Sequence, residues 1–113
     1  MRDIQQKLLA TFAIEHRDHV EQIRAFLVSI ENAAQPAGAE LDEAFRRAHS
    51  LKGAARAVDL APVEGLAHRL ETLFSRVRQG GHALNGHVSR VVQQVLDASE
   101  DCVNAIGQND YPV

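Results

Sequence analysis

Several residue types are scarce in this chain, and each scarcity excludes a class of protein. A single cysteine, Cys102, can form neither an internal disulfide nor a cysteine cluster around zinc. There are only three prolines, and long runs of β-branched residues are rare, which favours helices over strands. No apolar run approaches the roughly 20 residues of a membrane span, and no signal-peptide pattern opens the chain. We therefore expect a soluble domain of the cytoplasm.

The charge balance and the length exclude two further classes. The 113 residues include 12 Lys and Arg against 15 Asp and Glu, which leaves a net charge of -3. A nucleic-acid-binding domain is normally strongly basic. The chain is too short for a complete ATP-dependent kinase, and it has no glycine-rich phosphate loop. With 45% hydrophobic and 24% charged residues, residues 1–113 are expected to form one globular domain.

Apolar residues recur at three- and four-residue intervals in four segments, and this period predicts amphipathic helices over residues 3–32, 40–58, 62–79 and 86–106. Pro36 and Gly38 fall in the first connection, Pro62 suits the first turn of the third helix, and Gly80 ends that helix. Connections this short predict an all-α fold, an antiparallel up-down four-helix bundle. Residues 107–113 lack periodicity and are expected to be a frayed or extra C-terminal segment.

The second predicted helix has an unusual charge pattern between residues 46 and 56. This stretch holds four cations and no anion in a chain that is acidic overall. At about 100° per residue, His49, Lys52, Gly53 and Arg56 share one flank beside the apolar stripe. Such cations repel one another unless an anion binds among them. The four cations are Arg46, Arg47, Lys52 and Arg56.

Gly53 is a second unusual feature of this helix. A glycine in the middle of a helix costs roughly 1 kcal/mol relative to alanine, so it indicates a spatial requirement. Because residues four apart are neighbours on a helix, Gly53 clears space beside the imidazole of His49. A close contact between two helices is the alternative explanation, although the helical period points Gly53 away from the core.

The third predicted helix carries two polar residues that can reach this flank. His68 and Glu71 are three residues apart and share a face. Since the second and third helices are joined by a short connection, His49 and Glu71 should lie at a similar height. Glu71 can then accept a hydrogen bond from Nδ1–H of His49, which leaves Nε2 exposed as a nucleophile. Lys52 can neutralise the oxygen charge of an arriving phosphoryl group.

The string AHSLKGAA, residues 48–55, resembles the signature of histidine-containing phosphotransfer (HPt) domains. It is most similar to the N-terminal phosphoacceptor domain of chemotaxis-type (CheA-like) histidine kinases, and the likeness covers the whole chain. The resemblance implies a phosphorelay module of two-component signal transduction. Such a domain takes a phosphoryl group from an ATP-dependent histidine kinase catalytic domain and passes it to an aspartate of a response-regulator receiver domain. ATP and Mg belong to those partner domains, and the resemblance implies no cofactor here.

The family's functional residues match this chain position by position. His49 matches the phosphoacceptor, and Lys52 the lysine that assists near the phosphate. Gly53 matches the small residue that opens access to the ring. Glu71 matches the carboxylate that orients the histidine, and His68 matches the second histidine of the polar network.

Other positions depart from the family pattern or lie outside it. Asp59 stands where the family usually has glycine, and aspartate tolerates the left-handed backbone that such a turn needs. Arg46, Arg47 and Arg56 either steer the acidic pocket of a receiver domain toward the site or form an ordinary solvated helix face. The resemblance favours the N-terminal piece of a longer kinase over a stand-alone carrier.

Two alternative functions belong to other classes. The first is a non-phosphorylated helical adaptor, a pseudo-HPt domain that binds a receiver or kinase domain. The second is a metal site made by His49, His68 and Glu71, which the neighbouring cations oppose. A further pair, His16 and His19, is a weak metal signal, and the acidic residues around it predict an exposed face. We expect no metal site.

Overall fold

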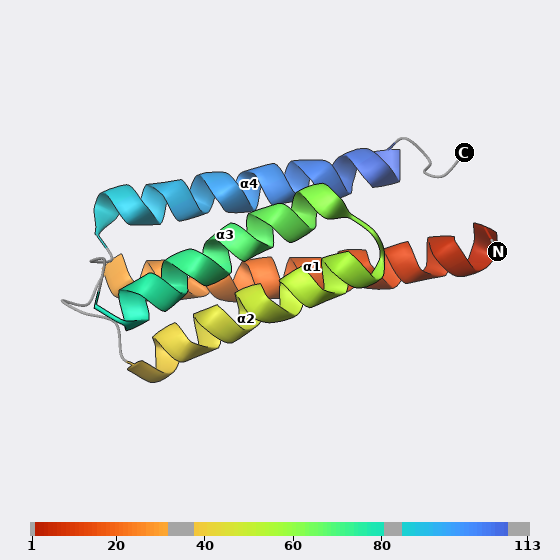
Figure 1. Ribbon diagram of the computed structural model, residues 1–113. Helices are drawn as coiled ribbons and strands as arrows, with labels where there is room; N and C mark the ends of the chain where they lie inside the picture. The colour runs from red at the N-terminus through yellow and green to blue at the C-terminus, as the bar shows by residue number, and fades with distance from the viewer. Residues whose placement is uncertain (1, 32–37, 81–84, 109–113) are drawn as a thin grey trace.

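Four α-helices run alternately up and down in the computed structural model, which describes residues 2–31, 38–80 and 85–108 (Figure 1). The predicted all-α antiparallel bundle is confirmed, and each described helix end lies within two residues of its predicted position. Residue 32, the predicted end of the first helix, lies outside the described residues. Of the predicted C-terminal segment, Gly107 and Gln108 belong to the fourth helix, and residues 109–113 lie outside the described residues. The helices are α1 (Arg2–Glu31), α2 (Gly38–Ala57), α3 (Ala61–Arg78) and α4 (Gly86–Gln108).

The connection between α2 and α3 is short because α2 ends in a hydrogen-bonded reversal. Asp59 adopts a left-handed backbone with φ of 62°. Its N–H donates to the carbonyl of Arg56 at 3.1 Å, and the N–H of Leu60 donates to the carbonyl of Ala55 at 2.9 Å. This pair of bonds is the Schellman motif, in which the left-handed residue is usually glycine. Asp59 therefore fills the position in the conformation expected for it, and α3 begins directly afterwards with Pro62 in its first turn.

The hydrophobic core has two parts that hold α2 and α3 in place. The larger part joins all four helices and includes Ile23, Leu27, Phe74 and Leu96, which are fully buried. The smaller part lies toward the α2–α3 connection and consists of Phe12, Leu51, Ala55, Val63 and Ala67.

The face of α1 that carries His16 is buried, so the prediction of an exposed face is wrong there. The His16 side chain is only 3% exposed, and its Nε2 lies 2.5 Å from Oγ of Ser99 on α4. His19, one turn further, is half-buried. The hydroxyl on α4 gives the His16 imidazole a polar partner within the bundle. Over the residues that the structure describes, no helix is both long enough and apolar enough to cross a membrane.

The buried His16 predicts that the protein loses stability in mild acid. Burial lowers the pKa of His16 from its ordinary value of 6.5, and the Glu100 carboxylate offsets only part of this effect. The unfolded chain then binds a proton at a pH where the folded chain does not. The contribution of His16 to the free energy of unfolding should therefore be constant above about pH 7 and decrease as the pH drops below about 6.5. Denaturant titrations at a series of pH values measure it.

The double variant His16→Leu with Ser99→Ala is the control, because it removes both buried polar partners. Its unfolding free energy should depend less on pH over the same range. Part of the dependence should remain, since burial and the nearby Arg47 also lower the pKa of His19. An identical pH dependence in the variant and the original protein would contradict the prediction.

Candidate functional site

His49 and Glu71 face each other across α2 and α3, which lie side by side and antiparallel (Figure 1). His49 projects from the middle of α2 with 64% of its side chain exposed, whereas Glu71 on α3 is only 12% exposed. Nδ1 of His49 is hydrogen-bonded to Oε2 of Glu71. The cross-helix contact predicted from the spacing is therefore present.

The direction of this hydrogen bond defines the state of the imidazole. An ionised carboxylate only accepts hydrogen bonds, so Nδ1 of His49 carries the proton. In the neutral ring, Nε2 then holds the lone pair. Because the side chain is mostly exposed, this nitrogen is available to an electrophile from solution or from a partner protein.

Lys52 occupies the other oxygen of the same carboxylate. Its Nζ donates to Oε1 of Glu71 at 2.6 Å, and its side chain is 26% exposed. Burial alone raises the pKa of Glu71, but the hydrogen bonds from Lys52 and His49 and their charges outweigh it, so the net pKa of Glu71 is lowered. Glu71 is therefore a carboxylate at neutral pH, with one oxygen on the imidazole and the other on the ammonium group.

Open space lies around Gly53, one helical turn from His49, as the sequence predicts. A Cβ atom added at Gly53 would meet nothing within 4 Å apart from its chain neighbours and the backbone of its own helix. A close contact between helices is therefore the wrong explanation for this glycine.

His68 borders the site without completing it. Its Nδ1 lies 3.7 Å from Oε1 of Glu71, which is ion-pair range but too long for a hydrogen bond, and its side chain is 63% exposed. No group of three or more His, Cys, Asp or Glu side chains that could hold a metal ion occurs in residues 2–31, 38–80 and 85–108.

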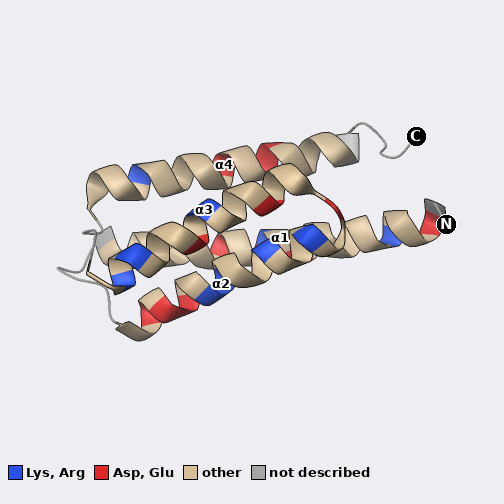
Figure 2. Ribbon diagram, viewed as in Figure 1, with Lys and Arg blue, Asp and Glu red and all other residues tan. Residues whose placement is uncertain are grey.

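The arginines that the sequence associates with this flank separate into two groups. Arg47 lies on the other side of α2, where it contacts Asp18 of α1 at 2.7 Å and Glu43 at 3.0 Å, so the structure does not bring it to the site. Arg46 is 69% exposed and lies 3.5 Å from Glu43. Arg56 is exposed in the last turn of α2. In Figure 2 the first turns of α2 are acidic and the basic residues follow toward its C-terminal end.

Phe45 and Arg78 are neighbours of His49 that sequence reasoning missed. The Phe45 ring stacks with the imidazole at an interplanar angle of 12° and 6.4 Å between centroids. The guanidinium carbon of Arg78 lies 4.2 Å from the centre of the Phe45 ring. Phe45 precedes His49 by four residues, so helical spacing places the two on one face and could have indicated the contact. Arg78 comes from the far end of α3 and has no such signal.

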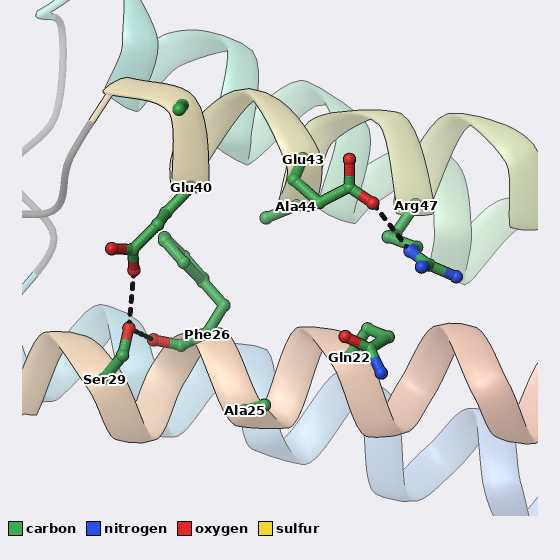
Figure 3. Close-up of a pocket in the computed structure, with 9 residues that line it drawn as sticks. Gln22, Ala25, Phe26, Ser29, Glu40, Glu43, Ala44 and Arg47 are labelled. Carbon is green, nitrogen blue, oxygen red and sulfur yellow. Dashed lines mark hydrogen bonds and ion pairs between the residues drawn. The ribbon is translucent and has the colours of Figure 1, made fainter.

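A hollow of about 370 Å³ lies elsewhere, between α1 and the first half of α2 (Figure 3). Its lining residues come from Gln22–Ser29 and Ala39–Arg47. Ser29 bridges it, since its hydroxyl lies 2.8 Å from Oε2 of Glu40. The hollow contains none of the residues that surround His49, so it is separate from the candidate site.

Comparison with known proteins gives the geometry a context. The family model of the Hpt domain matches residues 7–102. The chain is 31% identical to the chemotaxis protein CheA of Halobacterium salinarum over 87% of its length, and 33% identical to CheA of Treponema pallidum over 81%. It is 28% identical to the sensor histidine kinase CheAY of Helicobacter pylori over 81%. The chain spans 11 to 14% of the length of these relatives. No solved structure gives a significant match.

The matched region includes all of α2 and α3 and most of α1 and α4, and with them the whole of the candidate site. An exposed histidine held at Nδ1 by a carboxylate suits the transfer of a small electrophilic group. The chain therefore belongs to the Hpt domain family, the phosphotransfer modules of two-component signalling.

Proposed function

We propose that His49 is the phosphoacceptor of a phosphorelay. It takes a phosphoryl group from an ATP-dependent histidine kinase catalytic domain and passes it to an aspartate of a response-regulator receiver domain. The observation that carries this proposal is the arrangement around one ring. Nδ1 of His49 is bound to Glu71, while the ring is 64% exposed and Gly53 leaves open space beside it.

In the first transfer, the lone pair on Nε2 of His49 attacks the γ-phosphorus of ATP. A P–N bond forms, the bond from phosphorus to the bridging oxygen breaks, and ADP leaves with that electron pair. The ring then carries positive charge while Nδ1 keeps its proton. The Glu71 carboxylate, already hydrogen-bonded to Nδ1, stabilises this charge as it develops.

In this proposal Lys52 balances the charge of the phosphoryl oxygens. It lies one helical turn from His49, and its side chain is 26% exposed while its ammonium group is bound to Glu71. When the phosphoryl group arrives, Lys52 can bind its oxygens while Glu71 remains bound to the imidazolium. In the second transfer, a carboxylate oxygen of the receiver attacks the phosphorus, the P–N bond breaks, and the electron pair returns to Nε2.

ATP and Mg²⁺ are supplied by the partner domains in this proposal. The contribution of this chain is to hold one tautomer of the imidazole, to provide a nearby cation and to keep the approach open. In this proposal Arg46 and Arg56, which are exposed on α2, attract an acidic receiver surface.

Replacing His49 should remove phosphorylation completely. A purified chemotaxis-type kinase catalytic domain with labelled ATP should label the original protein, and the label should be labile in acid and stable in alkali. His49→Gln should carry no label. His68→Gln is the matched control, because His68 is similarly exposed and also adjoins Glu71. Label that persists in His49→Gln would show that His49 is not the phosphoacceptor. Absence of label on the original protein with several kinases would favour the adaptor function.

Replacing Glu71 should slow phosphorylation without abolishing it. The carboxylate biases the imidazole toward the tautomer with Nδ1–H but does not create that tautomer. We expect Glu71→Ala to lower the initial rate roughly tenfold or more, within the range for a group that positions a reactant. The initial rate of Glu71→Gln should lie between those of Glu71→Ala and the original protein, because the amide oxygen of glutamine still accepts a hydrogen bond but carries no charge. Equal rates in Glu71→Ala and the original protein would remove the cross-helix hydrogen bond from the mechanism.

A bulky side chain at position 53 should obstruct the approach to His49. Gly53→Leu should slow phosphorylation sharply and leave the fold intact, since a Cβ there meets nothing within 4 Å beyond its chain neighbours and its own helix backbone. Gly65→Leu on α3 is the matched control, because Gly65 is also helical with open space around it. Both variants should unfold at denaturant concentrations no lower than the original protein, since each removes a glycine from a helix. Similar transfer rates in the two leucine variants would contradict the steric explanation.

A further inference from the structure

We propose that Phe45 is a positioning residue that fixes the plane of the His49 imidazole. The proposal rests on the proposed function of His49 and adds a second contact to the one made by Glu71. It follows from the near-parallel arrangement of the two rings, with 12° between their planes and 6.4 Å between their centroids.

One hydrogen bond and the covalent bond to Cβ still allow an exposed imidazole to tilt. The bond from Nδ1 to Glu71 holds one atom of the ring, but small changes in the two side-chain torsions tilt the ring while that bond bends. The His49 side chain is 64% exposed, so few protein atoms surround the ring to prevent such movement. The Phe45 ring lies offset beside the imidazole and nearly parallel to it, and it restricts this tilting because a tilted imidazole loses the near-parallel arrangement.

Phe45 itself is held from two directions. It is partly buried and packs against the larger part of the core. The guanidinium carbon of Arg78 lies 4.2 Å from the centre of the Phe45 ring, and Nη1 of Arg78 lies 3.3 Å from Oδ1 of Asp42. Arg78 on α3 and His49 on α2 are thus the two groups beside the Phe45 ring, and Asp42 of α2 holds Arg78. The Phe45 ring is therefore held in place beside the His49 imidazole.

The plane of the ring matters because the reacting lone pair lies in it. Nε2 must point along the line from phosphorus to the leaving oxygen, and a tilted ring misses that line. The energies of aromatic pairs correspond to about a 3- to 10-fold change in rate if stacking is needed to reach the transition state. Glu71 and Phe45 then have different roles, since Glu71 sets the tautomer of the imidazole and Phe45 sets its plane.

Phe45→Leu tests this inference, because leucine still fills the core position but offers no ring. Phosphorylation is measured with two donors. One is the kinase catalytic domain with ATP, and the other is the small molecule phosphoramidate, which transfers its phosphoryl group without a partner protein docking on the domain. We expect the rate to fall about 3- to 10-fold with both donors. The KM for the domain as kinase substrate should be unchanged. Phe45→Tyr, which keeps the ring, should restore the original rate.

Nuclear magnetic resonance supplies a measurement that would not change if Phe45→Leu only weakened the packing of the core. In Phe45→Leu, the nitrogen shifts of His49 should keep the Nδ1–H tautomer because Glu71 is intact. The couplings that report its side-chain torsions should become averaged. Phe26→Leu is the matched control: Phe26 belongs to the same part of the core, packs edge-to-face on Phe74 at 6.0 Å, and should lose stability but not rate. If Phe45→Leu does not fold, Phe45→Met repeats the test.

Three results would overturn the inference. Unchanged rates with both donors would show that the stacking has no part in transfer. A loss confined to the kinase reaction would make Phe45 a docking contact rather than a positioning residue. An equal loss in Phe26→Leu would assign the effect to the core. Absence of any label on His49 in the original protein would instead overturn the proposed function, and this inference with it.

Discussion

The Glu71 carboxylate is the group on which the rest of the site depends, because its two oxygens organise two different helical positions. One oxygen accepts the hydrogen bond from Nδ1 of His49, and the other accepts from Nζ of Lys52. Its position between α2 and α3 leaves only 12% of the side chain exposed, so water competes weakly for these bonds. Both donors favour the ionised form, which overcomes the opposite effect of burial and lowers the pKa of Glu71. One buried charge thus fixes a tautomer and places a cation.

This carboxylate reaches both partners because a short connection sets the register between α2 and α3. The Schellman turn at Asp59 and Leu60 joins the two helices by a short hydrogen-bonded connection. The two parts of the hydrophobic core, one on either side of the site, hold the helices together. The glycine that the family usually has at this turn is absent, but aspartate reaches the same backbone region with φ of 62°. The departure at Asp59 therefore leaves the geometry of the turn, and hence the height of Glu71 relative to His49, intact.

The sequence predicted those features whose causes are local along the chain. Helix period, proline and glycine positions, and one short connection were enough for the bundle and for the contact between His49 and Glu71. The failures at His16 and Arg47 both involve partners on another helix. His16 is buried with its Nε2 hydrogen-bonded to the hydroxyl of Ser99, 83 residues later, and Arg47 turns from the site because Asp18 lies across from it on α1. Such pairs have no signal in the period of either helix, because each helix alone shows only that a polar residue flanks its apolar stripe.

In the proposed function, His49 must be exposed to two partner domains on one side and held by the bundle on the other, and different atoms of its ring meet these two demands. The holding groups approach from the bundle: Glu71 and Lys52 are mostly buried, and Phe45 packs on the core. Position 53 leaves the outer side open. If a partner domain supplies the reacting atoms, the bundle need contribute little beyond orientation, so its stability can reside in a core that never meets the substrate. Under the proposed function, a small helical domain with an open surface at His49 would suffice for transfer, because the docking domain would complete the reaction site.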